Sequence, residues 1–351
     1  MAILEVPRTV GTGGSPYADL SRRVKQAGLL DRRPAYYVMK TASTTVMLAA
    51  GWVAFFLVGD SWWQVAVAVY LAFAFTQVAF LGHDAGHRQV FRTRRANGLL
   101  GLALGNLLIG LSFGWWVGKH NRHHSRPNQL DADPDITIGA VAFTDEQART
   151  KRGVTRLIVR YQAYLFFPML LLEAVHLHAA SIRAVARGTV KLHSVEALLL
   201  LAHSIGYLTG LLVVLSPSRA AVFLIVQQGL FGLYLGCAFA PNHKGMPVLK
   251  EGEEPGFLRR QVLTSRNVRG GRLTDFALGG LNYQIEHHLF PSMPRPSLRR
   301  CQSVVREFCA EQRLPYSESG MVGSYAEALR HLHQVGASLR QPAPTAQVGT
   351  R

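Results

Sequence analysis

Six apolar stretches, each about 20 residues long, constrain the fold of this 351-residue chain more than any other feature. They cover residues 41–59, 62–82, 97–117, 157–179, 195–215 and 220–240. A helix of about 20 apolar residues is long enough to cross a bilayer. Because lipid offers no hydrogen-bond partner to an open backbone, the chain is expected to be an all-α integral membrane protein.

The connections between the stretches predict how the chain crosses the membrane. "GDSW" joins the first two stretches and "SPSR" joins the last two, so each pair is expected to form a helical hairpin with an outward-facing turn. The long connections hold most of the Lys and Arg, which places residues 1–40, 83–194 and 241–351 on the cytoplasmic side. The net charge of +17 fits this topology, and the lack of a groove-reading motif argues against a nucleic-acid partner.

The two middle stretches are expected to lie in the inner interface. If 97–117 crossed once, "HDAGH" at 83–87 and "HNRHH" at 120–124 would lie on opposite faces and could not cooperate. Four transmembrane helices in two hairpins are therefore predicted, with interfacial helices at 97–117 and 157–179 and a cytoplasmic cap that carries the histidines. Residues 1–40 form a lead-in and 41–310 the membrane domain; 311–351 form a C-terminal helix and a disordered tail at 341–351.

Seven of the fourteen histidines fall in three windows of five residues, which are "HDAGH", "HNRHH" and "QIEHH" at 284–288. On a helix, positions i, i+3 and i+4 share one face, so each window is expected to direct its imidazoles one way. Neutral imidazole binds iron, zinc, copper and nickel. The candidate metal ligands are therefore His83, His87, His120, His123, His124, His287 and His288.

Seven histidines exceed the three or four ligands that one zinc ion takes. An eighth, His243 in "FAPNHKGMP", lies at the expected inner end of the fourth span. Eight nitrogen donors on one side of the membrane suit two metal ions with open positions. Gln284, Asn242 and His178 are further candidates, as ligands directly or through water.

Four acids near the histidines are candidates to accept the second ring N–H of a ligand. They are Asp84, Asp131, Asp133 and Asp135, and a turn and capping role around Pro134 is equally open for the last three. The isolated histidines at 176, 193 and 203 are expected to be hydrogen-bonded structural residues. Those at 331 and 333 are expected to be solvated on a polar C-terminal helix.

The order and spacing of the three windows resemble those of the membrane fatty acid desaturases. HxxxH follows a paired span, HxxHH comes about thirty residues later, and QxxHH follows a second hairpin. The resemblance covers roughly residues 40–310. "EHHLFPSMPR" and "FAPNHK" are similar to the bacterial acyl desaturase branch, which implies a bacterial cytoplasmic membrane.

The resemblance implies a non-haem di-iron oxygenase that uses O₂ and two electrons to remove two hydrogens from an acyl chain. By position, the seven window histidines match the family's three boxes, and His243 matches an extra histidine before the third. The acyl substrate would be linked to coenzyme A, a carrier protein or a membrane lipid. Hydroxylation, ketone formation and triple-bond formation at the same site stay open, because small changes in substrate placement decide the outcome.

The chain departs from the family pattern in two respects. Gln284 opens the third box where many members have histidine, as in the front-end and acyl-lipid members, which puts one ligand in question. The "HPGG" signature of a fused haem domain is missing, so a separate electron donor such as a ferredoxin or a flavoprotein reductase is expected. The arginines that could attract an acidic donor, acyl phosphates or anionic lipid are Arg259, Arg260, Arg266, Arg269, Arg272, Arg295, Arg299 and Arg300. Positive-inside topology alone would supply many of these charges.

Two other classes of metalloprotein fit the sequence less well. A membrane metal transporter predicts ionisable residues near the middle of its spans, whereas the histidine windows lie at span ends or beyond them. A zinc protease predicts HExxH, which the sequence lacks.

Overall fold

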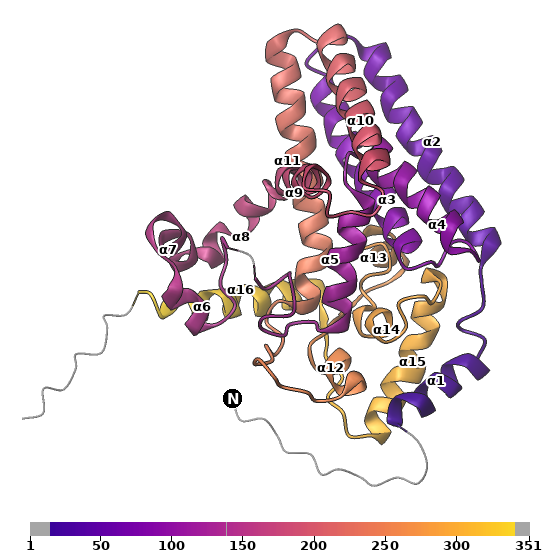
Figure 1. The fold of residues 1–351 in the computed structure, drawn as a ribbon, viewed down its shortest axis with the longest axis vertical. Helices are drawn as coiled ribbons and strands as arrows, with labels where there is room; N and C mark the ends of the chain where they lie inside the picture. The colour runs from indigo at the N-terminus through magenta and orange to yellow at the C-terminus, as the bar shows by residue number, and fades with distance from the viewer. Residues whose placement is uncertain (1–14, 138, 341–351) are drawn as a thin grey trace, which may run out of the picture.

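The computed structural model describes residues 15–137 and 139–340. Four long helices form a stalk, and shorter helices form a cap at one end of it (Figure 1). The stalk helices are α2 (Pro34–Val58), α3 (Gln64–Gly86), α10 (His193–Val214) and α11 (Pro217–His243). The tail at 341–351, predicted to be disordered, lies outside the described residues.

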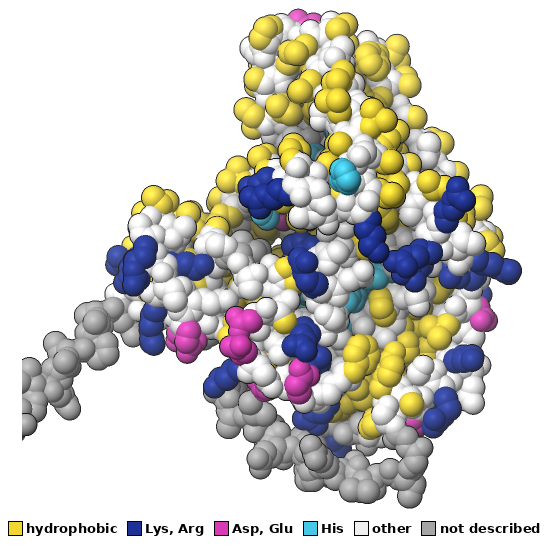
Figure 2. All heavy atoms as spheres, in the orientation of Figure 1, with side chains coloured by type: hydrophobic (Ala, Val, Ile, Leu, Met, Phe, Trp, Pro, Cys, Tyr) yellow, Lys and Arg dark blue, Asp and Glu magenta, His cyan; other side chains and the backbone are white. Residues whose placement is uncertain are grey.

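The four stalk helices have the length and composition of membrane spans. Their most apolar windows have mean hydropathies of 1.7 to 2.0. α3 packs against both α2 and α11, and Phe55, Phe75 and Phe231 fill the space between the helices. Large apolar side chains such as Leu57, which is 81% exposed, cover the outside of the stalk (Figure 2). The chain is therefore a membrane protein, and the four predicted spans coincide with these four helices.

Both middle stretches fold as bent pairs of helices. The first comprises α4 (Arg94–Gly101), the π-helix η1 (Leu102–Leu108) and α5 (Phe113–Ser125), with a bend of 114° before α5. The second comprises α8 (Gln162–Leu170) and α9 (Glu173–Ala186), with a bend of 69°. Each bent pair is either one broken span or a re-entrant segment, so the chain has four to six candidate spans, and the interfacial placement of both stretches stays a prediction. The side of the membrane on which each turn lies stays a prediction.

A buried polar network holds the sharper bend. Ser112 caps α5, since its Oγ accepts a hydrogen bond from the backbone N–H of Trp115 at 3.2 Å. The same hydroxyl donates to Glu196 Oε2 at 2.5 Å, and Asn106 Nδ2 donates to that oxygen at 3.0 Å. Asn106 Oδ1 in turn accepts from the N–H of Phe113. The direction of α5 therefore depends on a carboxylate that α10 supplies.

The cap packs onto one end of the stalk. α1 (Pro16–Gln26) buries Leu20 and Val24 against α15 (Arg295–Glu311), so α1 belongs to the cap, whereas residues 34–40 of the predicted lead-in belong to α2. The remaining cap elements are α12 (Phe257–Leu263), β1 (Asn267–Arg269), α13 (Arg272–Ala277), α14 (Gln284–Leu289) and β2 (Glu318–Gly320). β1 and β2 pair in parallel, which is a small departure from the all-α expectation.

A lateral arm completes the fold (Figure 1). It comprises α6 (Asp145–Thr150), α7 (Gly153–Arg160) and the C-terminal α16 (Met321–Ala337). α16 packs against α8 and α11 and thereby ties the end of the described chain to the stalk.

Candidate metal centre

Eight histidines from four helices meet where the stalk joins the cap. α3 contributes His83 and, directly after its last turn, His87, and α5 contributes His120, His123 and His124. α11 contributes its last residue, His243, and α14 contributes His287 and His288. All of them except the half-buried His120 are buried. Residues up to 205 positions apart in the sequence, counting from 83 to 288, thus form one site.

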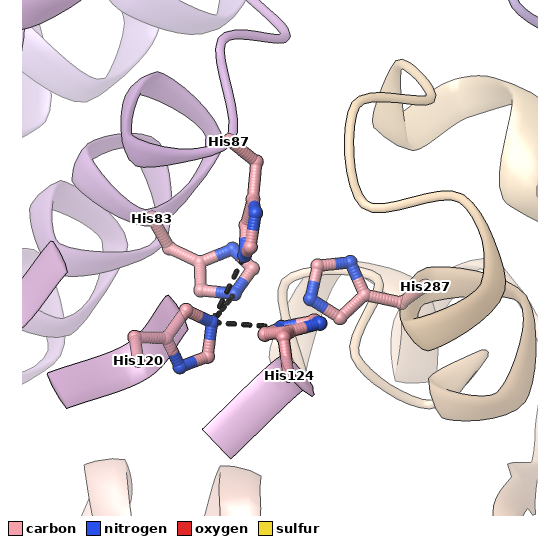
Figure 3. A group of neighbouring side chains, drawn as sticks. All are labelled: His83, His87, His120, His124 and His287. Carbon is pink, nitrogen blue, oxygen red and sulfur yellow. Dashed lines mark hydrogen bonds between the residues drawn. The ribbon is translucent and has the colours of Figure 1, made fainter. Parts of the chain in front are cut away.

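Five of these histidines form a first group, His83, His87, His120, His124 and His287 (Figure 3). One ring nitrogen of each lies within 4.8 Å of the others. His120 Nε2 lies 3.2 Å from His83 Nε2, 2.9 Å from His87 Nε2 and 3.0 Å from His124 Nε2. Figure 3 shows His287 approaching this set from the opposite side, on α14.

The three close contacts of His120 cannot all be hydrogen bonds. A ring nitrogen of neutral imidazole either carries one proton or offers one lone pair, so it satisfies one neighbour at most. Two nitrogens bound at right angles to one metal ion, with bonds of about 2.1 Å, lie about 3.0 Å apart. The spacing therefore fits lone pairs that share a cation.

The second group comprises His123, His243 and His288. His123 Nε2 lies 3.3 Å from His243 Nε2. The two groups adjoin, because the ring of His288 stacks on that of His124 with 4.1 Å between the ring centres. Two neighbouring clusters of imidazole nitrogens suit two metal ions, as the number of histidines predicts.

The histidine boxes divide between the two groups. The sequence predicts that each box directs its imidazoles one way, and this holds for His83 and His87. In the second box His120 and His124 join the first group while His123 joins the second, and in the third box His287 and His288 separate in the same way. Adjacent residues on a helix point about 100° apart, so a box placed between two clusters can supply both.

Two buried nitrogens support the assignment of a cation site. Among the described residues, Nε2 of His287 and Nε2 of His288 have no hydrogen-bond partner. A buried polar atom without a partner costs about 1–3 kcal/mol, so native proteins rarely leave one unpaired. A bound metal ion would supply the missing partner of both atoms. The donor set, all imidazole nitrogen, fits iron as well as zinc or copper.

The other ring nitrogens of the second group are held by oxygen acceptors. His123 Nδ1 donates to both oxygens of Asp133 at 3.0 Å, and His243 Nδ1 donates to Thr264 O at 2.9 Å. His288 Nδ1 donates to Gln261 Oε1 at 2.9 Å. Each contact leaves Nε2 free to face its neighbours, which fixes the tautomer that a metal ligand needs.

The sequence singled out Asp133 but not the other two acceptors. Gln261 also donates from Nε2 to His124 O at 2.9 Å, so it links the second and third boxes. Its position in an arginine-rich segment gives no signal of this role, and Thr264 acts only through its backbone oxygen.

The other three predicted acids lie differently. Asp84 Oδ1 is 3.7 Å from His83 Nδ1, and Asp84 pairs mainly with Arg295 at 2.7 Å. Asp135 lies 3.5 Å from His123 Nδ1 and pairs with Lys119; burial raises its pKa, but Lys119 and His123 outweigh this effect and lower the pKa below its usual value. Asp131 is exposed in a turn with φ of +67°, which agrees with the turn role that the sequence left open.

The three additional ligand candidates lie at different distances from the two histidine groups. Gln284 Nε2 lies 2.9 Å from His243 Nε2, so this amide adjoins the second group. Asn242 Nδ2 donates to Gln284 Oε1 at 3.1 Å and lies behind that amide. His178 belongs to neither group, because its ring nitrogens contact Gly110 O at 2.9 Å and Gln228 Oε1 at 3.1 Å. We therefore leave His178 out of the ligand set.

The histidines outside the boxes differ partly from expectation. His203 donates to Leu107 O and is structural, as predicted. His176 and His193 are exposed, with His176 3.5 Å from Glu173, so neither is a buried structural residue. His333 is exposed as predicted, but His331 is half-buried and contacts Phe143 O at 3.1 Å.

Three of the eight arginines proposed for an inner basic surface are buried. Arg266 is fully buried and donates to the backbone oxygens of Pro241 and Lys244, and Arg260 is 7% exposed. Arg295 is 8% exposed, donates to Phe80 O at 2.7 Å and forms an ion pair with Asp84. Arg266 and Arg295 brace the cap against the stalk, whereas Arg260 pairs with Glu254, so none of the three is free for a partner.

A buried carboxyl on α14 is a further residue that the sequence did not single out. Glu286 Oε1 accepts from Tyr316 OH and its Oε2 accepts from Asn267 Nδ2, both at 2.7 Å. Asn267 Oδ1 also accepts from the N–H of Ile285. Burial raises the pKa of Glu286 to about 7. These contacts anchor the short helix that carries the third box.

A membrane stalk with two adjoining histidine clusters at its capped end defines a membrane protein with a candidate metal centre of the histidine-box type. The chain matches the family model described as fatty acid desaturase over residues 60–320. It therefore belongs to the fatty acid desaturase family and is an oxidoreductase, which confirms the family and the desaturase function predicted from the sequence.

Individual relatives agree with this assignment. The chain is 32% identical to an acyl-lipid (9-3)-desaturase of Physcomitrium patens, over 88% of this chain and 61% of that protein. It is 31% identical to the Delta(6)-fatty-acid desaturase fat-3 of Caenorhabditis elegans, over 93% of this chain and 76% of that protein. It is also 31% identical to the Delta(5) fatty acid desaturase fat-4 of that organism, over 92% of this chain and 75% of that protein. The chain thus spans about three fifths to three quarters of the length of these relatives.

Proposed function

We propose that this chain is an O₂-dependent fatty acyl desaturase whose two histidine groups hold two iron ions. The observation that carries the proposal is the convergence of eight histidines in two adjoining groups within a desaturase fold family. One iron would be held by His83, His87, His120, His124 and His287, and the other by His123, His243 and His288 with Gln284 beside them.

Bound iron supplies the reactivity toward O₂ that removal of hydrogen from an unactivated methylene requires. The protein's own residues prepare the site for it. Asp133, Thr264 and Gln261 hold protons on Nδ1 of the second-group histidines and keep the Nε2 lone pairs directed inward. Burial of seven of the eight rings limits the access of water and protects reactive species from side reactions.

The proposed substrate is a fatty acyl chain within the membrane. The relatives carry names that specify desaturation at positions 5, 6 and 8, so we propose a new double bond in this region, near the carboxyl end. The linkage is a coenzyme A thioester, a carrier-protein thioester or a lipid ester. Hydroxylation, ketone formation or triple-bond formation is the alternative outcome at the same site.

The proposed setting is a bacterial cytoplasmic membrane with the cap, the histidines and the chain termini on the cytoplasmic side. The distribution of Lys and Arg supports this orientation. The three relatives described above are eukaryotic, so the bacterial assignment rests on the motif resemblance. An external donor, such as a ferredoxin or a flavoprotein reductase, would deliver the two electrons.

The experiment is a fatty-acid profile of cells that express the chain together with a ferredoxin and its reductase. Gas chromatography with mass spectrometry, after derivatisation of double bonds, locates the product. The His287→Ala variant removes one first-group nitrogen, and His333→Ala is the matched control because this histidine is exposed on α16. A new unsaturated acid in wild type and His333→Ala, absent from His287→Ala, is expected. A hydroxy or acetylenic acid with the same variant pattern would instead establish the alternative reaction.

A further inference from the structure

A hollow lined by two arginines lies where the chain enters and leaves the stalk. It has a volume of about 450 Å³ and is lined by Arg32, Pro34, Val90, Phe91 and Arg92. We call it the arginine hollow. It lies between the start of α2 and the loop that follows the first histidine box. None of its lining residues belongs to the two histidine groups.

The walls of the arginine hollow are held in place by hydrogen bonds. Arg32 Nη1 donates to Phe91 O at 2.7 Å and also to Arg88 O, which clamps the loop to the start of α2. The side chain of Asn97 closes the same loop, since its Oδ1 accepts from Phe91 N at 3.1 Å and its Nδ2 donates to Phe91 O at 2.8 Å. The hollow is thus formed by braced backbone.

The charge around the hollow is strongly positive. Arg32, Arg88, Arg92, Arg94 and Arg95 are all exposed. The flanking segments, residues 28–36 and 86–100, contain a single acid, at position 31. Figure 2 shows Lys and Arg side chains along the foot of the apolar stalk. Clusters of basic residues directly beside a membrane span attract anionic lipid headgroups.

The side of the hollow toward the stalk is apolar. Val38 lies one helical turn beyond Pro34 on the same face of α2 and is 69% exposed. Val90 and Phe91 are apolar residues of the lining itself, and Phe91 is 44% exposed. A ligand that fits this surface carries a negative headgroup and an apolar tail. A soluble phosphate compound would leave the apolar half uncovered.

We propose that the arginine hollow binds the phosphate of an anionic phospholipid, with the lipid's acyl chains lying along α2 at Val38. Phosphate is a favourable ligand for guanidinium groups because of its charge and its paired oxygens. The loop also connects the lipid to the metal centre. Buried Gln89 donates to Pro291 O at 2.8 Å and accepts from Tyr37 OH at 2.7 Å, so the first box and the segment after the third box are tied together next to the hollow. The proposal concerns lipid binding and does not depend on the reaction catalysed.

The test is equilibrium binding of an acyl-labelled fluorescent phospholipid to the purified full-length protein in a neutral detergent. Phosphatidylglycerol is the anionic probe, and phosphatidylcholine is the zwitterionic one. The double variant Arg32→Gln/Arg92→Gln removes both charges of the hollow. Arg22→Gln/Arg306→Gln is the control of equal charge change, because these arginines lie on α1 and α15 in the cap, outside the hollow; they pair with Asp19 and Glu318, and Arg306 also lies over the ring of Tyr316.

Wild type and the control are expected to bind phosphatidylglycerol at least tenfold more tightly than phosphatidylcholine. The hollow variant is expected to lose about 30-fold in affinity for phosphatidylglycerol, since each arginine near the headgroups contributes about fivefold. Arg92→Glu provides a second variant, because within the described residues Arg92 is exposed and makes no protein hydrogen bond, so its replacement leaves the loop intact. It should weaken binding with unchanged metal content.

Three results would overturn the proposal. One is equal affinity of wild type for the two lipids, and another is an equal loss in the hollow and control variants, which would indicate a general charge effect. The third is displacement of the lipid by free coenzyme A or pyrophosphate at micromolar concentration, which would assign the arginines to a soluble phosphate ligand. Because binding is measured without turnover, failure of the desaturase assay would leave this outcome unaffected.

Discussion

Replacing Glu196 with alanine is expected to loosen the metal centre, although Glu196 touches none of the histidines. Its Oε2 accepts hydrogen bonds from Ser112 Oγ at 2.5 Å, Asn106 Nδ2 at 3.0 Å and Gly114 N at 3.3 Å. All three donors lie at the bend that gives α5 its direction, and α5 carries three of the eight histidines. Glu196 is therefore a positioning residue.

The magnitude follows from the donors left without a partner. Ser112 and Asn106 are fully buried, and each unsatisfied buried donor costs about 1–3 kcal/mol. A total of about 3 kcal/mol disfavours the bent arrangement about 100-fold relative to its alternatives. We expect Glu196→Ala to lower the melting temperature by about 5 °C and to reduce the iron bound per chain.

The assay compares Glu196→Ala with Glu196→Gln, in detergent, by thermal unfolding and by metal analysis. All three donors use one oxygen, so the glutamine carbonyl retains most of the acceptor and should preserve metal binding. Gly114→Ala adds a third variant, because its Cβ would lie 2.3 Å from Glu196 Oε1 and push the carboxylate away. Full iron content and an unchanged melting temperature in Glu196→Ala would refute the reasoning.

Three further predictions concern the centre itself. Asp133→Asn should weaken second-group metal affinity about 10- to 100-fold, because His123 loses its carboxylate acceptor, whereas Asp131→Asn should not; iron retained against a graded chelator measures both. The pKa of Glu286 is about 7 in the folded protein and about 4.5 in the unfolded chain. Its protonation therefore contributes about 3 kcal/mol to the free energy of unfolding below pH 4.5, and this contribution is lost as the pH rises through 7. Glu286→Gln should therefore flatten the fall in melting temperature between pH 5 and pH 8. Removal of iron by a chelator should lower the melting temperature of wild type, because metal bound only to the folded state stabilises it.

The stalk could be predicted because the length of an apolar helix is set by the thickness of the bilayer. The bounds shift by a few residues where a helix continues into the cap. α2 begins at Pro34, seven residues before the predicted span, because proline suits the first turn of a helix and buried Tyr37 packs inside the protein. A segment at 97–117 that stays in the interface was expected from the need to keep two histidine boxes on one side, but the bend before α5 was not. Its cause, a carboxylate more than 80 positions away, has no local signal.

The seven box histidines could be singled out because their spacing is local, and His243 because it lies at the end of the fourth span, but their division into two groups could not be predicted. Whether His123 and His124 serve the same cluster depends on where α14 crosses α5, and that depends on contacts such as Gln261 to His288. The burial of individual arginines, in contrast, could not be predicted from the sequence. Arg266 and Arg295 look like surface charges in the sequence, yet the fold surrounds each with backbone oxygens and an acid.

The most direct test of the two-group centre is the number of irons per chain in the purified full-length protein. Inductively coupled plasma mass spectrometry gives the iron concentration, and amino-acid analysis gives the protein concentration. We expect about two irons per chain in wild type, a loss in both His120→Ala and His243→Ala, and wild-type content in His333→Ala. His120 lies in the first group and His243 in the second, so each variant empties a different position. One iron per chain that survives either substitution, or no iron after reconstitution under anaerobic conditions, would contradict the two-group centre.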